Sequence, residues 1–129
     1  MKEPNFKNFR ALIVDDNENC VLALSHILNK IYGIEVDTAT GGFEAIKKSE
    51  DMNYDIIFMD YIMEDFDGLL TSVYIRTLRD EDWFTKVPII VVSGATEKKE
   101  IFLTNGINEF IEKPASVANI EPILKKYLK

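Results

Sequence analysis

The chain has 129 residues and a formal net charge of -7, which fits one domain with a sizeable core. An acidic chain argues against nucleic acid or an anionic membrane as a direct partner, because both attract a basic patch. The single cysteine, Cys20, excludes an internal disulfide and suits a reducing compartment. No apolar run approaches the roughly 20 residues of a membrane span, and the first residues lack the apolar segment of a signal peptide. We therefore expect a soluble, cytoplasmic module that is a monomer or a weak dimer.

Short apolar runs alternate with helical patterns along the chain. Strands are predicted at about 10–15, 34–39, 55–59, 88–92 and 107–112, and helices at about 18–32, 42–52, 68–80, 97–105 and from the last strand to the end. The second strand is the least apolar and is expected at an edge of the sheet. Gly33 should end the first helix, and Pro122 is tolerable only near the first turn of the last one. This βα repeat predicts an α/β fold with a parallel sheet and helices on both faces.

Chemically active side chains follow four of the five predicted strands. Asp15 and Asp16 come after the first strand, Asp60 closes the third, Ser93 follows the fourth and Lys113 follows the fifth. In open α/β sheets the ligand site lies beyond the carboxyl ends of the strands. The sequence therefore predicts a site that combines three carboxylates, a hydroxyl and an ammonium group.

Three neighbouring carboxylates cannot all stay ionised in a partly buried cleft without a cation. Oxygen ligands with open coordination positions suit Mg²⁺, which keeps several waters and shares a phosphoryl oxygen. An aspartate can also be a nucleophile that forms an aspartyl phosphate. The Lys113 ammonium and the Ser93 hydroxyl could then neutralise phosphoryl oxygens.

In these features the chain resembles the receiver domain of response regulators in two-component signalling. The resemblance rests on the pair at 15–16 and on the stretches 60–68, 92–95 and 112–114, which occur in the order and at about the spacing typical of the family. It covers essentially the whole chain, and the segments 75–90 and 105–110 look most like receivers of hybrid histidine kinases. The resemblance implies a single receiver domain over residues 1–129, with a flavodoxin-like sheet of strand order 2-1-3-4-5.

The resemblance also implies roles for individual residues. Asp60 would accept a phosphoryl group from a partner's phosphohistidine, on a histidine kinase or a histidine phosphotransfer protein. Mg²⁺ would be held by the carboxylates of Asp15, Asp16 and Asp60 and by the backbone carbonyl of Ile62. The domain would catalyse its own phosphorylation and slow dephosphorylation, and it would not be a conventional enzyme.

Four further positions take their roles from the same resemblance. Ser93 would swing toward the phosphoryl group and Lys113 would pair with it. The peptide bond before Pro114 would be cis. The aromatic ring of Phe110 would switch with phosphorylation, although an alternating strand position also suits a core residue.

The chain departs from the family pattern at two positions. Glu64 stands where the family usually has proline, so we expect a more mobile loop after Asp60. Gly94 stands where alanine is common, which should loosen the segment that carries Ser93.

The first helix predicts a docking face. Its stripe facing the sheet is expected to consist of Val21, Leu24, Leu28 and Ile31. A second stripe at the same spacing, made of Cys20, Ala23 and Ile27, is expected to face outward beside the acidic pocket and to contact the partner. Deeper burial of the whole helix is the simpler alternative.

Other interpretations remain open at this point. Each residue taken alone has an ordinary role, for example a helix cap for Asp15 or a surface charge for Lys113. A haloacid-dehalogenase-like phosphatase would use Asp15 as nucleophile, but its pattern wants an acid where Asn17 stands. A histidine phosphotransfer module would use the only histidine, His26, but such modules are helical bundles. A receiver fold that serves only for binding is a third alternative.

Overall fold

A five-stranded parallel sheet forms the centre of the computed structural model, which describes residues 5–77, 87–94, 99–104 and 106–129. Its strands are β1 (Arg10–Val14), β2 (Glu35–Ala39), β3 (Ile56–Met59), β4 (Ile89–Ser93) and β5 (Glu109–Glu112). They lie in the order β2-β1-β3-β4-β5. This order confirms the flavodoxin-like topology and the edge position of the second strand.

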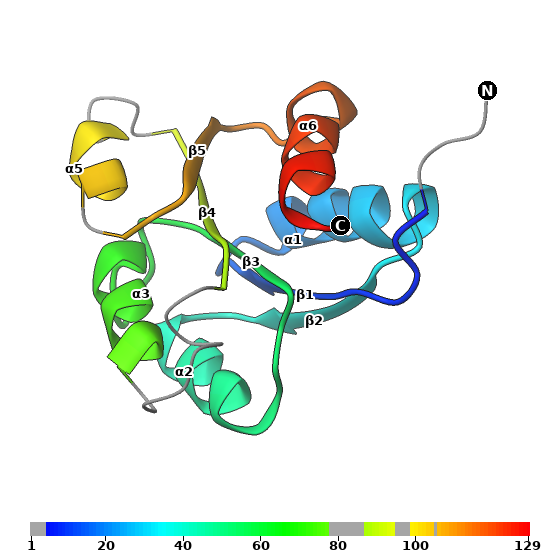
Figure 1. Cartoon of the computed structure of the whole chain (residues 1–129). Helices are drawn as coiled ribbons and strands as arrows, with labels where there is room; N and C mark the ends of the chain where they lie inside the picture. The colour runs from blue at the N-terminus through cyan, green and yellow to red at the C-terminus, as the bar shows by residue number, and fades with distance from the viewer. Residues whose placement is uncertain (1–4, 78–86, 95–98, 105) are drawn as a thin grey trace.

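Helices follow each strand and cover both faces of the sheet. They are α1 (Glu18–Ser25) continued by η1 (His26–Ile31), α2 (Gly42–Asp51), α3 (Gly68–Thr77), α5 (Lys99–Thr104) and α6 (Val117–Tyr127). Figure 1 shows α1 and α6 together on one side of the sheet and α2 with α3 on the other. The predicted ends of helices at 80 and 97, and most of the connection at 83–87, lie outside the described residues. Every helix in the described part of the chain is too short or too polar to cross a bilayer.

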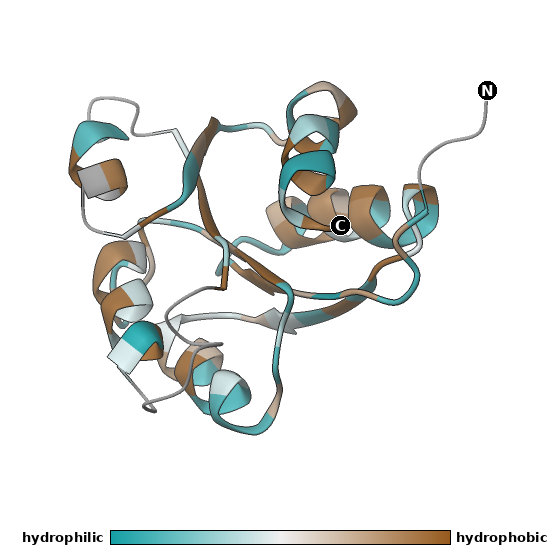
Figure 2. Cartoon of the chain, viewed as in Figure 1, coloured by the Kyte–Doolittle hydropathy of each residue, from teal (hydrophilic) through white to brown (hydrophobic). Residues whose placement is uncertain are grey.

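Alternate residues of the strands build two cores, one on each face of the sheet. In β1, Ala11 and Ile13 point to the core under α1 and α6, whereas Leu12 and Val14 point to the core under α2 and α3. The central strands are therefore apolar along their length, as expected for a parallel sheet buried on both faces (Figure 2). This rigid double core fixes the strand ends that carry the functional side chains.

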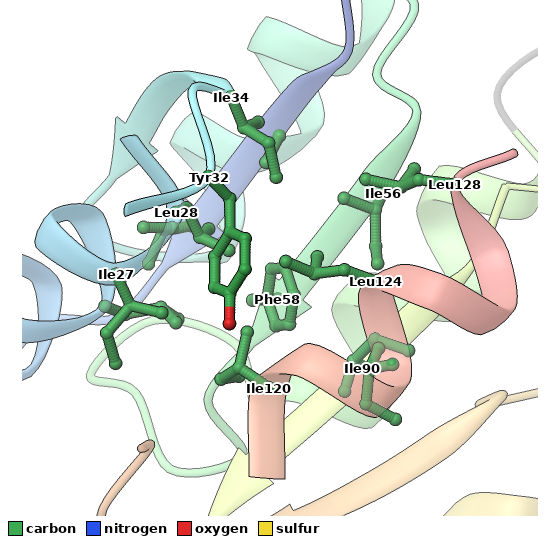
Figure 3. Packing of buried hydrophobic residues seen from close by; sticks show 14 of the residues in the cluster. Ile27, Leu28, Tyr32, Ile34, Ile56, Phe58, Ile90, Ile120, Leu124 and Leu128 are labelled. Atoms are coloured by element: carbon green, nitrogen blue, oxygen red, sulfur yellow. The ribbon is translucent and has the colours of Figure 1, made fainter. Parts of the chain in front are cut away.

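The first helix covers the predicted range but changes its winding. The Asn17 side chain caps α1 by accepting from the Cys20 amide, and the wider π-helical η1 completes the helix. Gly33, with φ 77°, follows the helix as predicted. The expected outward position of Ile27 is wrong, because its side chain is only 8% exposed. Ile27 lies three residues after Leu24 and belongs to the same buried cluster, so it is part of the inward-facing stripe. Figure 3 shows Ile27 and Leu28 in this core.

The last helix begins earlier than Pro122 suggests. Ser116 and Asn119 form a capping box that starts α6 at Val117, so Pro122 lies inside the helix. Pro122 therefore lies in the second turn of α6, deeper in the helix than expected. The cap upstream satisfies the first turn, and the helix tolerates the loss of one backbone hydrogen bond because Ile120, Ile123 and Leu124 are buried against the sheet.

Candidate functional site

The ends of β1 and β3 place two aspartates next to each other. Val14 pairs with Met59 in the parallel register, so Asp15 and Asp60 leave the sheet at the same level. The Asp60 amide continues the ladder by donating to the Val14 carbonyl at 2.8 Å. Asp15 and Asp60 are only 6% and 8% exposed. Sheet pairing alone therefore brings these two carboxylates together.

Lys113 reaches both carboxylates from the end of β5. Its ammonium group lies 3.1 Å from Asp15 Oδ2 and 3.3 Å from Asp60 Oδ1. The Lys113 backbone amide donates to the Ser93 carbonyl at 3.0 Å, which fixes the lysine beside β4. One cation therefore balances two carboxylates that the fold has largely removed from water.

The charges in this cluster shift the pKa values of its members. Burial raises the pKa of Asp60, and the neighbouring Asp15 charge adds to the effect, while Lys113 opposes it. Burial would lower the pKa of Lys113, but the hydrogen bond to Asp15 and the two carboxylate charges outweigh it and leave that pKa raised. The cluster therefore holds three carboxylates against the Lys113 ammonium group, which leaves an excess of negative charge.

The donor atoms suit a hard divalent cation. Asp15, Asp16 and Asp60 offer carboxylate oxygens that all lie within 4.8 Å of one another, and Asp16 is exposed while the other two are buried. A further cation between them would relieve the excess of negative charge beside Asp60. An all-oxygen set that is open to solvent on one side fits Mg²⁺, which retains several waters.

The other residues singled out in the sequence occupy different parts of this end of the sheet. Ser93 ends β4 and is 2% exposed, and Phe110 is half-buried in β5 against the core under α2 and α3. The Lys113–Pro114 peptide bond is cis, as the resemblance implies. The Ile62 side chain is 68% exposed in the loop after Asp60.

A mainly apolar hollow lies beside the acidic cluster. Half-buried Cys20 and exposed Ala23 line it from α1, while Pro114 and Ala115 line it from the segment after β5. Asp15, Asp60 and Lys113 border the same hollow. Two of the three predicted docking residues thus lie next to the site, and the third, Ile27, is in the core.

Sequence reasoning missed Asp65, whose carboxylate caps α2. It accepts from the amides of Gly42 and Phe43 at 2.9 Å each. The hydrogen bond from the Phe43 amide is the largest influence on the pKa of Asp65 and lowers it. Burial acts in the opposite direction, but the hydrogen bonds from backbone amides outweigh it, so the pKa is lowered. The pair Gly41-Gly42 was an available signal, because a helix that opens on glycines has no capping side chain of its own.

Comparisons with known proteins agree with this geometry. Residues 11–125 match the family model of the response regulator receiver domain. The chain is 34% identical over 127 residues to transcription factor SKN7 of Candida albicans, covering 97% of the chain and 22% of that protein. It is 35% identical over 123 residues to hybrid signal transduction histidine kinase L of Dictyostelium discoideum, covering 92% of the chain and 7% of that protein. The chain thus spans about a fifth or less of these relatives.

Solved structures give the same result. The response regulator TrrA of Thermotoga maritima, in complex with Mg²⁺ and BeF, superposes with a TM-score of 0.81 at 28% identity, covering 93% of this chain and 99% of TrrA. The receiver domain of sensor histidine kinase PA1611 of Pseudomonas aeruginosa, with magnesium in its active site cleft, gives 0.82 at 26% identity, with 92% and 96% coverage.

Fold, site and matched residues together define the class: this chain belongs to the response regulator receiver domain family. It is a receiver domain of two-component signalling. This membership excludes the histidine phosphotransfer alternative, because such modules are helical bundles and this chain is built on a parallel sheet. The only histidine, His26, is an exposed residue at the start of η1. The match to the receiver family also takes the place of the haloacid-dehalogenase-like phosphatase, in which Asp15 would be the nucleophile.

Proposed function

We propose that Asp60 accepts a phosphoryl group from a partner's phosphohistidine and that Mg²⁺ assists this transfer. A carboxylate oxygen of Asp60 forms a bond to phosphorus while the bond between phosphorus and the imidazole nitrogen breaks. The imidazole carries a proton on its other ring nitrogen, so it leaves as a neutral histidine of the partner. The single observation that carries the proposal is the position of the Asp60 carboxylate, which has oxygens within 4.8 Å of those of Asp15 and Asp16 and lies 3.3 Å from the Lys113 ammonium.

The proposed metal ligands are Asp15, Asp16, Asp60 and the backbone carbonyl of Ile62. A bound magnesium ion supplies charge neutralisation for a phosphoryl oxygen and orients it. Buried Asp15 is already held by Lys113 and by the Asn17 amide at 2.9 Å, so it is preorganised, whereas exposed Asp16 can exchange water for metal.

Lys113 and Ser93 would stabilise the product. The Lys113 ammonium is within 3.3 Å of Asp60 and can follow the phosphoryl group as negative charge moves onto it. Ser93 is buried at the neighbouring strand end, where its hydroxyl can donate to a phosphoryl oxygen. Phe110, half-buried in β5, is the proposed reporter, whose ring would change rotamer with phosphorylation. The gain of about -1.5 to -2 charge drives the change.

The proposed partners are a histidine kinase, a histidine phosphotransfer protein, or both. Relatives named as hybrid histidine kinases in Dictyostelium discoideum support this direction. The docking face that we propose, corrected for the burial of Ile27, consists of Cys20 and Ala23 on α1 beside the hollow that borders the site. We further propose that residues 1–129 form one receiver domain in the cytoplasm, as a monomer or weak dimer, with no contact to nucleic acid or membrane.

The test is modification by a small phosphoryl donor. Acetyl phosphate, or beryllofluoride as a mimic, should modify Asp60 and only in the presence of Mg²⁺. Asp60→Asn should abolish the modification, and Asp16→Ala should weaken metal binding by at least tenfold. Stoichiometric labelling of Asp60→Asn would overturn the assignment, and a native chain that binds Mg²⁺ but takes no label would favour a receiver fold used only for binding.

A further inference from the structure

The loop that follows the phosphoacceptor is tied to a helix from another part of the chain. Asp65 is not one of the three aspartates of the acidic cluster. Its carboxylate accepts hydrogen bonds from the Gly42 and Phe43 amides, each at 2.9 Å. These are the first two residues of α2, and the N-cap residue Gly41 has no side chain that could do this. An ionised carboxylate at a helix N-terminus makes charge-assisted bonds to amides that otherwise lack a partner.

The α2 side of this contact is shaped for close approach. A Cβ atom at Gly41 would lie 2.8 Å from Asp65 Oδ1, and one at Gly42 would lie 2.2 Å from Thr71 Oγ1 and 2.9 Å from the Phe66 Cβ. Gly41 has φ -168°, an extended conformation open to any residue. Lack of space therefore accounts for both glycines, because the backbone at the start of α2 lies too close to the loop and to α3 for a side chain to fit between them.

Both ends of the loop are fixed as well. The Gly68 amide donates to the Tyr61 carbonyl at 2.7 Å, and a Cβ atom at Gly68 would lie 2.2 Å from the Asp60 carbonyl oxygen. Met63 is buried in the core under α2 and α3. The remaining freedom of the loop lies between these points, where Ile62 and Glu64 are exposed, and Asp65 is the side chain that anchors this outer part.

From this geometry we infer that Asp65 is a positioning residue for the metal site. By tying the loop to the N-terminus of α2, it holds the Ile62 backbone carbonyl in place beside the carboxylates. The inference rests on the proposed function, in which that carbonyl is a magnesium ligand. Residues that orient metal ligands commonly change metal affinity by about ten- to a hundredfold when they are removed.

The test compares Mg²⁺ affinity and stability in matched variants. Asp65→Ala removes the tie, and Glu64→Ala removes an equal charge from the adjacent position, which is exposed. Gly41→Ala disturbs the same contact from the α2 side, because a Cβ atom there would lie 2.8 Å from Asp65 Oδ1. Dissociation constants for Mg²⁺ would be measured by calorimetry, and unfolding midpoints would be measured without metal.

We expect Asp65→Ala to weaken Mg²⁺ binding about tenfold, Glu64→Ala to stay within about twofold, and Asp65→Asn, which keeps one acceptor oxygen, to fall between them. The double variant of Asp65→Ala with Gly41→Ala should bind about as weakly as the weaker-binding single variant, because both changes act on one contact. If Asp65→Ala loses stability but binds Mg²⁺ like the native chain, Asp65 is only a helix cap and the inference is overturned. Equal weakening by Glu64→Ala would also overturn it, in favour of a general charge effect. A native chain that fails to bind Mg²⁺ would overturn the proposed metal site itself, a different outcome from either.

Discussion

Lys113 and Asp15 are 98 residues apart in the sequence and form an ion pair of 3.1 Å at the end of the sheet. The same ammonium group lies 3.3 Å from Asp60. Side chains at the ends of the first and last strands therefore both lie beside the proposed phosphoacceptor. The pair is partly buried, with Lys113 still a quarter exposed. This arrangement leaves more acid than base in the pocket, so the ionised form of Asp60 is disfavoured in the folded protein.

Asp60→Asn should stabilise the metal-free protein at pH 7. Burial, then the Asp15 charge, raises the pKa of Asp60, so ionised Asp60 costs the folded state free energy relative to the unfolded chain. That cost is absent below the ordinary aspartate pKa of about 3.9 and grows as the pH rises through the folded value. The gain from asparagine should therefore shrink on acidification. Unfolding midpoints at several pH values in EDTA would measure it.

The control for this effect is Asp16→Asn, which removes an exposed carboxylate of the same cluster. It should raise the metal-free midpoint less than Asp60→Asn does. A lower midpoint for Asp60→Asn at pH 7 would show that the bond to Lys113 outweighs burial.

Tyr54→Phe should change the stability of the protein at alkaline pH. Tyr54 is buried, and its hydroxyl donates to Asp37 at 2.8 Å. Burial first, then the hydrogen bond and charge of Asp37, raises the pKa of Tyr54. Because the folded pKa is the higher one, the stabilisation is present below the ordinary value of about 10 and is lost as the pH rises above it. The variant should lose about 1 kcal/mol at neutral pH but show a shallower decline between about pH 10 and 11.

Chemical denaturation at each pH would measure both effects. Tyr74→Phe removes a partly exposed tyrosine on α3 and should keep the native pH dependence. Parallel alkaline losses in the native chain and in Tyr54→Phe would contradict the assignment.

A charge at Ala23 should separate protein donors from small donors. Ala23 is exposed on α1 and lines the hollow beside Lys113 and Asp15. Ala23→Asp should reduce transfer from a phosphorylated kinase or phosphotransfer domain by at least tenfold, because a desolvated charge without a partner is costly in an interface. Labelling of Asp60 by acetyl phosphate should be unchanged. Ala23→Ser, small and uncharged, should keep both activities, and equal loss with both donors would indicate a folding defect instead.

The phosphorylated state should be long-lived. Hydrolysis needs a water held in line with the phosphoryl bond, and polar side chains at the flanking positions can hold it. By analogy with the receiver family, those positions are Ile62, which is exposed in the loop after Asp60, and Ala95, which lies outside the described residues. Neither side chain can hydrogen-bond a water. Ile62→Asn combined with Ala95→Glu should speed phosphate release several-fold, followed by loss of label after removal of the donor. Unchanged or slower release would refute the role of these side chains.

The local pattern of the sequence was sufficient for the parallel α/β fold class and for the location of the site, whereas the strand order was taken from the resemblance to receiver domains. Apolar runs of strand length alternating with helical segments admit few arrangements other than a parallel sheet, and carboxyl ends of parallel strands share one edge. Asp15, Asp60, Ser93 and Lys113 each directly follow or end a strand, so their common location needed no distance information.

Tertiary packing decided the features that depend on contacts between distant segments. Ile27 could be assigned to either stripe of its helix until the width of the buried face was known. Pro122 suggested a later helix start, but the Ser116 cap and the packing of the helix on the sheet outweigh one missing hydrogen bond. Asp65 finds its amide partners 22 and 23 residues away, and a pattern with a period of two or 3.6 residues carries no information on such a pairing. Periodicity determines which face of an element is buried, whereas the contacts that position a loop depend on how the whole chain packs.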